Sequence, residues 1–283
     1  MSELITGAGG QLGRALASQF PEAIATTREE LDIADKESVE AFDFSSIDTI
    51  INAAAYTKVD EAETPDGKVA AYAANRDGVA NLAAIAGERE LTLVHISTDY
   101  VFDGNKQEPY REDDPINPLS VYGQSKAEGE KLAANVAKHY IIRTSWVVGD
   151  GGNFVKTMMS LAEKDIDPSV VNDQFGRPTF TVDLARVIDH LLRVAPEPGT
   201  YHFSNAGEVI SWADLAKEVF FAAGYDAKRV SGTTTAEYFA GKEGVAPRPK
   251  NSVFDLSKIE STGFLNRHWR EALVEYVEQE LAN

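Results

Sequence analysis

Short apolar runs alternate with longer stretches of mixed apolar and polar residues from the start of the chain to about residue 147. The runs are almost continuously apolar, which is typical of strands buried on both faces, and the stretches between them have helical periodicity. Strands of this kind joined by helices predict a doubly wound α/β fold around a parallel sheet. Four such runs are residues 23–26, 49–52, 91–96 and 140–143.

The alternation loosens after Val147, where Gly149, Gly151 and Gly152 interrupt the chain and prolines follow at intervals. This break predicts a large domain over residues 1–147 and a smaller C-terminal domain made mainly of residues 148–283. The segment 182–205 begins with helical periodicity, and we expect it to return to the large domain.

Composition narrows the possible chemistry. The 283 residues include no cysteine, which excludes disulfides, thiolate zinc sites and a cysteine nucleophile. The five histidines have no metal-ligand spacing, so no catalytic metal is expected. A net charge of −18 argues against nucleic acid as a partner, and a phosphate-bearing ligand would need a local basic or dipolar cradle. Without a visible leader or membrane span, we expect a cytoplasmic protein with no membrane partner.

A glycine-rich segment follows the first predicted strand directly. Gly7, Gly10 and Gly13 have the spacing of a loop that turns tightly, lets a pyrophosphate approach backbone N–H groups, and packs a helix closely on a strand. The helix that starts near Gln11 and Leu12 adds a partial positive charge at the same place. A structural turn can carry such glycines, but their position between strand and helix favours a Rossmann-like dinucleotide site.

Residues after the second predicted strand favour NADPH. A fold that prefers NADH normally has an acidic residue there, whereas this chain has Thr26, Thr27 and Arg28. Arg28 could hold a 2′-phosphate, so we expect NADPH, with NADH as the alternative. Further residues fit an adenine pocket and a small-residue wall beside the cofactor, or equally a surface turn and ordinary strand-end packing: Asp32, Ile33, Ala53, Ala54, Ala55 and Tyr56.

Tyr122 and Lys126 are the candidate catalytic pair. Four residues apart in a predicted helix, they lie on one face. An ammonium near the phenol is expected to lower the tyrosine pKa from about 10 toward neutral pH, as suits a proton donor to a nascent alkoxide. The spacing alone is weak evidence, because Tyr238 and Lys242 repeat it with no other sign of chemistry nearby.

Two hydroxyl residues strengthen the pair. The strand over residues 91–96 runs out into Ser97 and Thr98, at the carboxyl edge of the sheet where ligands of open α/β folds bind. Thr98 could therefore share a substrate carbonyl with Tyr122. A turn hydroxyl that caps backbone groups is the other interpretation of Thr98. The glycine loop and the Tyr122–Lys126 pair in the same chain favour the catalytic interpretation.

Seven segments together resemble the extended short-chain dehydrogenase/reductase family. The resemblance covers nearly the whole chain, and its most specific parts are Ser-Thr-Asp-Tyr-Val-Phe-Asp-Gly and Asp-Gln-Phe-Gly-Arg-Pro-Thr. The segments are residues 7–13, 52–60, 97–104, 122–126, 143–147, 173–179 and 247–252.

The resemblance implies a reductase that converts the 4-keto group of dTDP-4-dehydro-6-deoxy-L-mannose to the hydroxyl of dTDP-L-rhamnose, with the smaller domain binding substrate. Tyr122 would be the proton donor, Lys126 would bind the nicotinamide ribose, and Thr98 would polarise the carbonyl. The expected cofactor contacts are Gly7, Gly10, Gln11, Leu12, Arg28, Asp32, Ile33, Ala53, Ala54, Ala55, Tyr56, Thr57, Ser97, Tyr122 and Lys126. The expected substrate contacts are Thr98, Asp99, Tyr100, Tyr122, Trp146, Asn153 and Arg248.

Three further residues bear on the resemblance. Arg248 lies between two prolines and could bind the substrate pyrophosphate through its guanidinium, although a solvated basic turn is the alternative. Asn75 matches an asparagine that family members often have near the active site. Ala15 stands where some members have an acidic residue that helps magnesium bridge two subunits. A magnesium-linked dimer is therefore doubtful, and we expect a monomer or a weak homodimer.

Two other functions fit parts of the pattern. Another nucleotide-sugar 4-reductase or an epimerase would share the cofactor residues, but an epimerase keeps its cofactor and gives no net oxidation. A non-catalytic regulatory subunit would keep the fold and lose the activity. The intact set of Tyr122, Lys126 and Thr98 argues against the regulatory subunit.

Overall fold

A single parallel sheet organises the computed structural model, which describes residues 2–282. Its six strands follow the order β10-β5-β4-β3-β1-β2, and every neighbouring pair is parallel. The prediction of a Rossmann-like doubly wound parallel sheet is therefore confirmed. The strands are β1 (Glu3–Thr6), β2 (Ile24–Thr26), β3 (Thr49–Asn52), β4 (Thr92–Thr98), β5 (His139–Thr144) and β10 (Gly199–Phe203).

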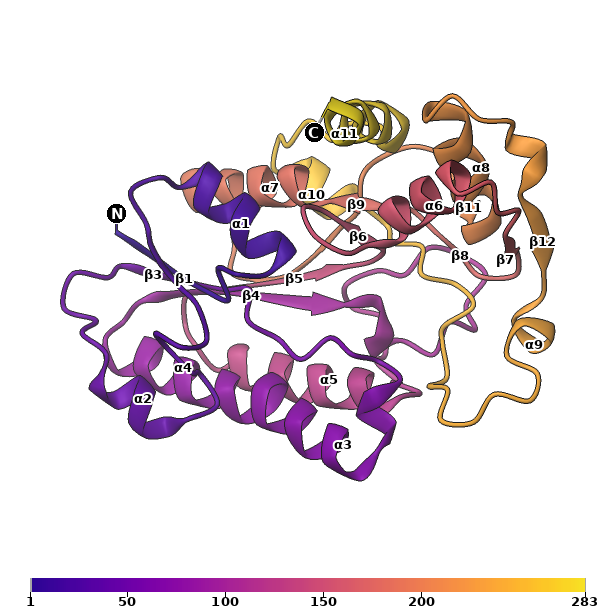
Figure 1. The fold of residues 1–283 in the computed structure, drawn as a ribbon. Coiled ribbons are helices and arrows are strands. Elements are labelled where there is room, and N and C mark those ends of the chain that lie inside the picture. The colour runs from indigo at the N-terminus through magenta and orange to yellow at the C-terminus, as the bar shows by residue number, and fades with distance from the viewer. Residues whose placement is uncertain (1, 283) are drawn as a thin grey trace.

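Helices cover both faces of this sheet (Figure 1). On one face lie α1 (Gln11–Gln19), α7 (Thr181–Val194) and α10 (Ser257–Ser261), and α1 packs against α7. On the other lie α2 (Lys36–Ala41), α3 (Pro65–Tyr72), α4 (Gly78–Glu88) and α5 (Val121–Ala133). A π-helical turn, η2 (Ala73–Asp77), joins α3 to α4. Because both faces are covered, strand residues such as Ile50 and Ile51 are fully buried.

The order of the strands creates a binding crevice. The chain leaves β1 toward β2 on one side and later returns to place β3 on the other side. Ligands of open α/β sheets bind outside the carboxyl ends of the strands at such a switch point. The ends of β1, β3, β4 and β5 should therefore hold the site.

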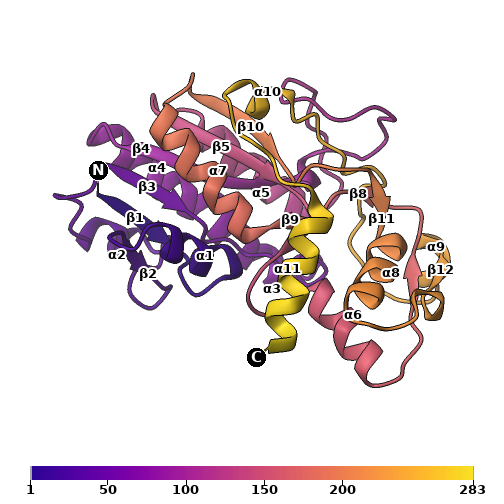
Figure 2. The ribbon, with the colours of Figure 1, turned by 90° about the horizontal axis from the view of Figure 1, so that it is seen from above.

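A smaller lobe lies beside the carboxyl ends of the strands and has its own core, which includes Val155, Phe220 and Trp269. Figure 2 shows α6, α8, α9 and β12 on one side of the sheet, with α11 between α7 and α8. Its elements are β6 (Val147–Val148), α6 (Phe154–Glu163), β7 (Ser169–Val171), β8 (Phe175–Gly176), β9 (Thr179–Phe180), β11 (Ile210–Ser211), α8 (Trp212–Ala222), β12 (Ser231–Thr233), α9 (Thr235–Tyr238) and α11 (Trp269–Ala282).

The two lobes are interleaved along the chain. Strand β10 pairs with β5, so residues 199–203 belong to the main sheet although they follow the start of the smaller lobe. Phe254, Ile259 and Phe264 also join the main core, beside Leu184 and Phe203. Three single-turn 3₁₀ helices complete the connections, η1 (Glu61–Glu63), η3 (Asp99–Val101) and η4 (Ala227–Arg229). Within residues 2–282 no helix is long and apolar enough to cross a membrane.

Candidate active site

A cavity of about 360 Å³ lies at the carboxyl ends of β1, β3, β4 and β5. It brings together many of the residues that the sequence predicts for cofactor and substrate: Gly10, Gln11, Leu12, Ala53, Ala55, Thr57, Ser97, Thr98, Asp99, Tyr100, Tyr122, Lys126 and Trp146. Other predicted residues do not line it: Gly7, Arg28, Asp32, Ile33, Ala54, Tyr56, Asn153 and Arg248. Six residues that were not predicted do: Val59, Ile96, Thr144, Ser145, Val147 and Leu184. We call this the main cavity.

The glycine loop forms one wall of the main cavity. Gly7 has a φ of +74°, and a Cβ there would lie 2.7 Å from the backbone of Ala54. A Cβ on Gly13 would lie 2.1 Å from the carbonyl oxygen of Gly7. Gly10 is the N-cap of α1 and has no side chain to cap the first N–H groups of that helix. These free donors and the tight loop fit the pyrophosphate of a dinucleotide.

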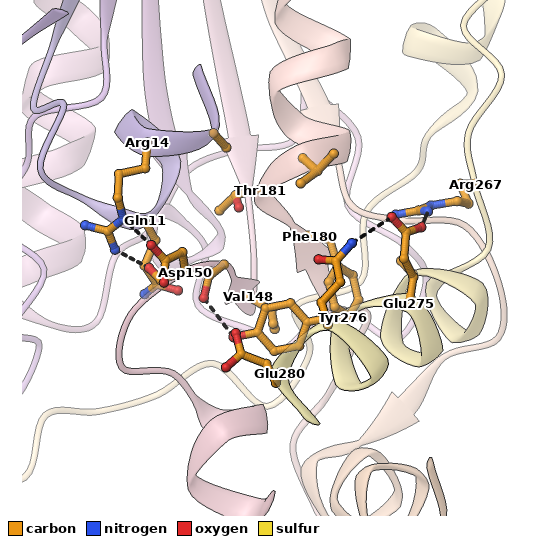
Figure 3. A pocket seen from close by; sticks show the side chains of 15 residues that line it. Gln11, Arg14, Val148, Asp150, Phe180, Thr181, Arg267, Glu275, Tyr276 and Glu280 are labelled. Atoms are coloured by element: carbon orange, nitrogen blue, oxygen red, sulfur yellow. Dashed lines mark hydrogen bonds and ion pairs between the residues drawn. The ribbon is translucent and has the colours of Figure 1, made fainter. Parts of the chain in front are cut away.

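Beside the glycine loop, two side chains of α1 contact the loop between β6 and α6 (Figure 3). The Nε of Arg14 lies 2.8 Å from Oδ2 of Asp150, and Gln11 donates a hydrogen bond to the carbonyl of Gly152 at 3.2 Å. Gln11 also borders a second cavity of about 340 Å³ that reaches to α11 and is lined by Arg14, Asp150 and Tyr276. Gln11 therefore borders both the main cavity and this second one.

The residues after β2 have contacts of their own. The side chain of Arg28 is 83% exposed and lies 3.0 Å from Asp32, four residues later. Asp32 also accepts a hydrogen bond from the N–H of Ala34 at 3.0 Å, and Ile33 is buried in the core beside Gly78. Arg28 is largely exposed and paired with Asp32, whereas Ile33 has an evident packing role.

Asn75 ties the loop after β3 to the catalytic helix. Its Oδ1 accepts from the N–H of Tyr56 at 2.8 Å, and its Nδ2 donates to the Tyr56 carbonyl and to the Ser125 hydroxyl, each at 3.0 Å. Ala53, Ala55 and the backbone of Tyr56 are thereby held at a fixed distance from α5. The side chain of Asn75 is buried and satisfied, which is a structural role.

Helix α5 delivers the tyrosine and the lysine. Ser120 caps it by accepting from the N–H of Gly123 at 3.1 Å. A Cβ on Gly123 would lie 2.2 Å from the carbonyl oxygen of Tyr100, so only glycine lets the helix approach η3 this closely. Tyr122 and Lys126 line the main cavity one turn apart, and the rings of Tyr122 and Tyr100 meet edge to face at 5.4 Å.

Burial determines how the pair ionises. It raises the pKa of Tyr122 to about 12, partly offset by a hydrogen bond with the Thr98 side chain and reinforced by the charge of Asp99. Burial lowers the pKa of Lys126 to about 8, while Glu130 opposes this. The expectation that the tyrosine pKa falls toward neutral pH is wrong, because desolvation of the phenol dominates and raises it. A phenol with this pKa is protonated at neutral pH, which is the state a proton donor needs.

Hydroxyl groups surround the phenol. Thr98 donates to Oδ1 of Asp99 at 3.0 Å. The hydroxyls of Ser97 and Thr144 are buried in the main cavity and have no hydrogen-bond partner among the described residues. Buried polar atoms of this kind usually have a partner, so these two are available to a bound molecule. Thr144 ends β5 beside Thr98, and that position at a strand end was the signal that could have identified it.

Trp146 closes the main cavity on the side of the smaller lobe. Its backbone has a φ of +49°, which is unusual for a bulky residue and turns the chain sharply after β5. The indole stacks on Trp212 with ring centroids 3.8 Å apart. Gly176 packs against it so closely that a Cβ would lie 2.8 Å from the indole. The ring is thus fixed between the lobes.

A third cavity, of about 330 Å³, lies behind the Trp146–Trp212 stack. It is lined by Arg248, Tyr238, Phe239 and Trp212 among others. Arg248 lies 2.8 Å from Asp60, and this pairing lowers the pKa of Asp60. The structure therefore sets Arg248 apart from the main cavity, at an aromatic pocket. Asn153 lines neither cavity; it caps α6 by accepting from the N–H of Lys156 at 3.0 Å.

No group of three or more histidine, aspartate or glutamate side chains within residues 2–282 could hold a metal ion. His95 lies mid-strand in β4, fully buried, with its Nδ1 3.2 Å from the amide of Asn52. Burial moves its pKa well below the ordinary value, so the ring is neutral. It is a core residue.

Known proteins match this chain over nearly its whole length. A dTDP-4-dehydrorhamnose reductase of Aggregatibacter actinomycetemcomitans is 44% identical over 95% of this chain and 96% of its own. A crystal structure of a dTDP-4-dehydrorhamnose reductase from Clostridium acetobutylicum has a TM-score of 0.91 at 42% identity, covering 99% of this chain and 100% of that one. A dTDP-4-dehydrorhamnose reductase from Bacillus anthracis in complex with NADP has a TM-score of 0.88 at 37% identity, with 99% of each chain covered.

The family model also spans the chain. It is described as the RmlD substrate binding domain, and it matches residues 1–282. Together with the relatives, this match confirms the resemblance seen in the sequence. The chain belongs to the RmlD substrate binding domain family.

Proposed function

We propose that this protein is an NADPH-dependent oxidoreductase that reduces the 4-keto group of dTDP-4-dehydro-6-deoxy-L-mannose (dTDP-4-dehydrorhamnose) to dTDP-L-rhamnose, the reductive step of dTDP-rhamnose biosynthesis. One observation carries the proposal: Thr98, Tyr122 and Lys126 line one cavity together with Gly10 of the glycine loop. The relatives that match over nearly the whole chain are named for this reaction.

The residues divide the work of the reduction. The bound nicotinamide would supply the hydride to the carbonyl carbon. Tyr122, protonated at neutral pH, would give its proton to the carbonyl oxygen as negative charge grows there. Lys126 would stabilise that charge as a cation in the same cavity, which the Thr98 hydroxyl also lines. Ser97 and Thr144, with unpaired hydroxyls, would hold polar groups of the nicotinamide half or of the sugar.

The third cavity suits the nucleotide end of the substrate. Trp146 borders the main cavity and stacks on Trp212, which borders the third cavity, so a molecule with the length of a sugar nucleotide could reach both. Arg248 provides a guanidinium for a phosphate, and Tyr238 and Phe239 provide faces for a base. We assign substrate binding to Arg248 on this basis.

The cofactor assignment rests on Arg28 and on the fit of the glycine loop. Arg28 projects into solvent near the end of β2, where a 2′-phosphate of the adenosine ribose would lie. The relative from Bacillus anthracis was solved with NADP. NADPH is therefore the proposed cofactor, and NADH remains a possible second one.

Purified protein mixed with dTDP-4-dehydrorhamnose and NADPH should consume the reduced cofactor and form dTDP-L-rhamnose in equal amounts. An epimer of the substrate, formed without net loss of NADPH, would identify an epimerase instead. Bound cofactor with no turnover would favour a regulatory subunit. If the protein reduces a different nucleotide sugar in preference to this one, the proposed mechanism stands and the proposed substrate is contradicted.

We extend the proposal to a cytoplasmic enzyme that is a monomer or weak homodimer. Ala15 supports the weak association, because it offers no carboxylate to a magnesium ion between subunits. Sedimentation velocity with and without magnesium should give the same concentration-dependent mass. A dimer that forms only with magnesium would overturn this part of the proposal.

A further inference from the structure

Asp99 lies at the centre of a hydrogen-bonded cluster behind the catalytic tyrosine. Its side chain is buried, with 4% of the residue exposed. One carboxyl oxygen accepts from the hydroxyl of Thr98, and the other accepts from the hydroxyl of Ser252, which is 153 positions further along the chain. A carboxylate has no proton to donate, so both hydroxyls point their protons toward Asp99.

Ser252 is itself held firmly. Its N–H donates to the carbonyl of Phe175 at 2.8 Å, and the N–H of Phe175 donates to the carbonyl of Lys250, also at 2.8 Å. On the other side the N–H of Tyr110 donates to the carbonyl of Val253 at 2.7 Å. The segment that carries Ser252 is therefore fixed between two others, and its hydroxyl reaches Asp99 from a fixed backbone.

This arrangement decides what the Thr98 hydroxyl can do. Thr98 has one proton, and it is directed to Asp99. Its oxygen accepts from the N–H of Tyr100 at 3.2 Å, and the Thr98 side chain also hydrogen-bonds with Tyr122. The Thr98 hydroxyl is therefore held in place beside the phenol before a substrate arrives, and its contact with the phenol lowers the pKa of Tyr122.

We propose that Ser252 and Asp99 are positioning residues, which hold the Thr98 hydroxyl so that Tyr122 is aligned for proton transfer to the substrate carbonyl oxygen. This inference rests on the proposed function. Neither residue needs to touch the reacting carbonyl in this role. The smaller lobe thereby contributes to the chemistry through Ser252, which the main sheet alone could not supply.

The ionisation of Asp99 gives the inference a distinctive signature. Burial raises the pKa of Asp99 to about 6, while Ser252 and Thr98 oppose the rise. The titratable groups facing the cluster are Tyr100 and Tyr122, whose pKa values Asp99 raises, and beyond Tyr100 the ion pair of Arg248 with Asp60. Without the Ser252 hydroxyl, the pKa of Asp99 should rise further, because one hydrogen bond to the charged form is gone.

The test compares Ser252→Ala with Ser252→Thr and with the control Ser204→Ala, a buried serine whose hydroxyl bonds to the Asn205 carbonyl. We expect Ser252→Ala to move the acid limb of the kcat–pH profile up by about one unit, so that kcat falls roughly tenfold below that limb and recovers at higher pH. KM for the nucleotide sugar should stay unchanged. Ser252→Thr and Ser204→Ala should keep the wild-type profile.

A second variant covers the case in which Ser252→Ala does not fold. Asp99→Asn cannot ionise, so it should lower kcat and flatten the acid limb. A wild-type kcat–pH profile in Ser252→Ala, or an unchanged acid limb in Asp99→Asn, would overturn this inference. If the wild-type protein still turns over in the same assay, the proposed reductase function stands. A wild-type protein without turnover would overturn the reductase and this inference together.

Discussion

The ammonium of Lys126 donates a hydrogen bond to the carbonyl oxygen of Ile96 at 2.5 Å. This bond turns the lysine toward the end of β4, and the charge of Lys126 does not contribute to the pKa of Tyr122. Burial dominates both groups and moves them in opposite directions, the phenol up and the amine down. The amine is therefore the member of the pair that titrates near physiological pH.

The reductase activity should fall as pH rises through about 8. The pKa of Lys126 is about 8, so above this pH the amine loses the proton that gives it charge, and the growing alkoxide loses a stabilising cation. A kcat/KM–pH profile between 6 and 10 measures this limb. In Lys126→Met the kcat/KM should be low and constant over this pH range, without the alkaline limb. Lys138→Met, at an exposed lysine, should keep the limb. An alkaline limb retained in Lys126→Met would assign it to another group.

Replacing Tyr122 by phenylalanine should reduce kcat by roughly 10²–10⁴-fold, because the proton donor is removed and the ring is kept. Affinity for the cofactor, measured by fluorescence titration, should change little. The matched control is Tyr140→Phe, on strand β5 of the main sheet. It also removes one tyrosine hydroxyl, which donates to the Pro196 carbonyl at 2.9 Å. A rate near wild type in Tyr122→Phe would remove Tyr122 from the donor role.

Local pattern was enough to predict the main sheet. The runs at 49–52 and 140–143 lie within β3 and β5, because strands buried on both faces are marked by continuous apolar residues. Strands β6, β8, β9 and β11 have two residues each, and a segment that short has no periodicity to detect. The smaller lobe therefore had to be inferred from the break after Val147.

The sequence was enough to predict which residues form the site, but not their long-range contacts or their pKa values. Helical spacing and strand ends identify Tyr122, Lys126 and Thr98 as candidates, since the fold brings strand ends to one edge. The contact of Asp99 with Ser252 joins positions far apart in the chain and leaves no local signal. Likewise the pKa of Tyr122 follows from burial, which only the packed structure defines.

Asp99→Asn should make the protein more stable at neutral pH. The pKa of Asp99 is about 6 in the fold against an ordinary 3.8, so between these values the folded state binds more protons and stability falls as pH rises. Above pH 6 the buried charge costs about 3 kcal/mol at most. Urea unfolding at pH 7.5 should give a larger free energy of unfolding for the variant than for wild type, and at pH 4 this difference should be gone. Equal stability at pH 7.5 would contradict the raised pKa.

Arg28→Ala should reduce the preference for NADPH. If the guanidinium contacts the 2′-phosphate, its removal should raise KM for NADPH about tenfold or more and leave KM for NADH unchanged. The control is Arg193→Ala, which breaks another exposed pair, with Asp189, four residues away as Asp32 is from Arg28; the arginine side chains are 68% and 83% exposed. Parallel changes in both KM values would instead indicate a general loss of structure after β2.

Arg248→Ala should raise KM for the nucleotide sugar by roughly ten- to hundredfold, the range expected for a lost hydrogen bond to a charged group. kcat should change little, because Arg248 lines the third cavity and the reacting atoms would lie in the main one. Steady-state kinetics at saturating NADPH separate the two constants.

Arg229 provides an unusually close control for Arg248. Both guanidinium side chains are about one fifth exposed, at 18% and 19%. Each pairs with an aspartate, at 2.7 and 2.8 Å, and each lies over a phenylalanine ring. Arg229→Ala removes interactions of these two kinds, together with a second ion pair to Asp165, at a place away from the three cavities described. If both variants raise KM alike, the effect comes from a weakened lobe, and Arg248 belongs to a solvated basic turn; if only Arg248→Ala does, its guanidinium binds the substrate.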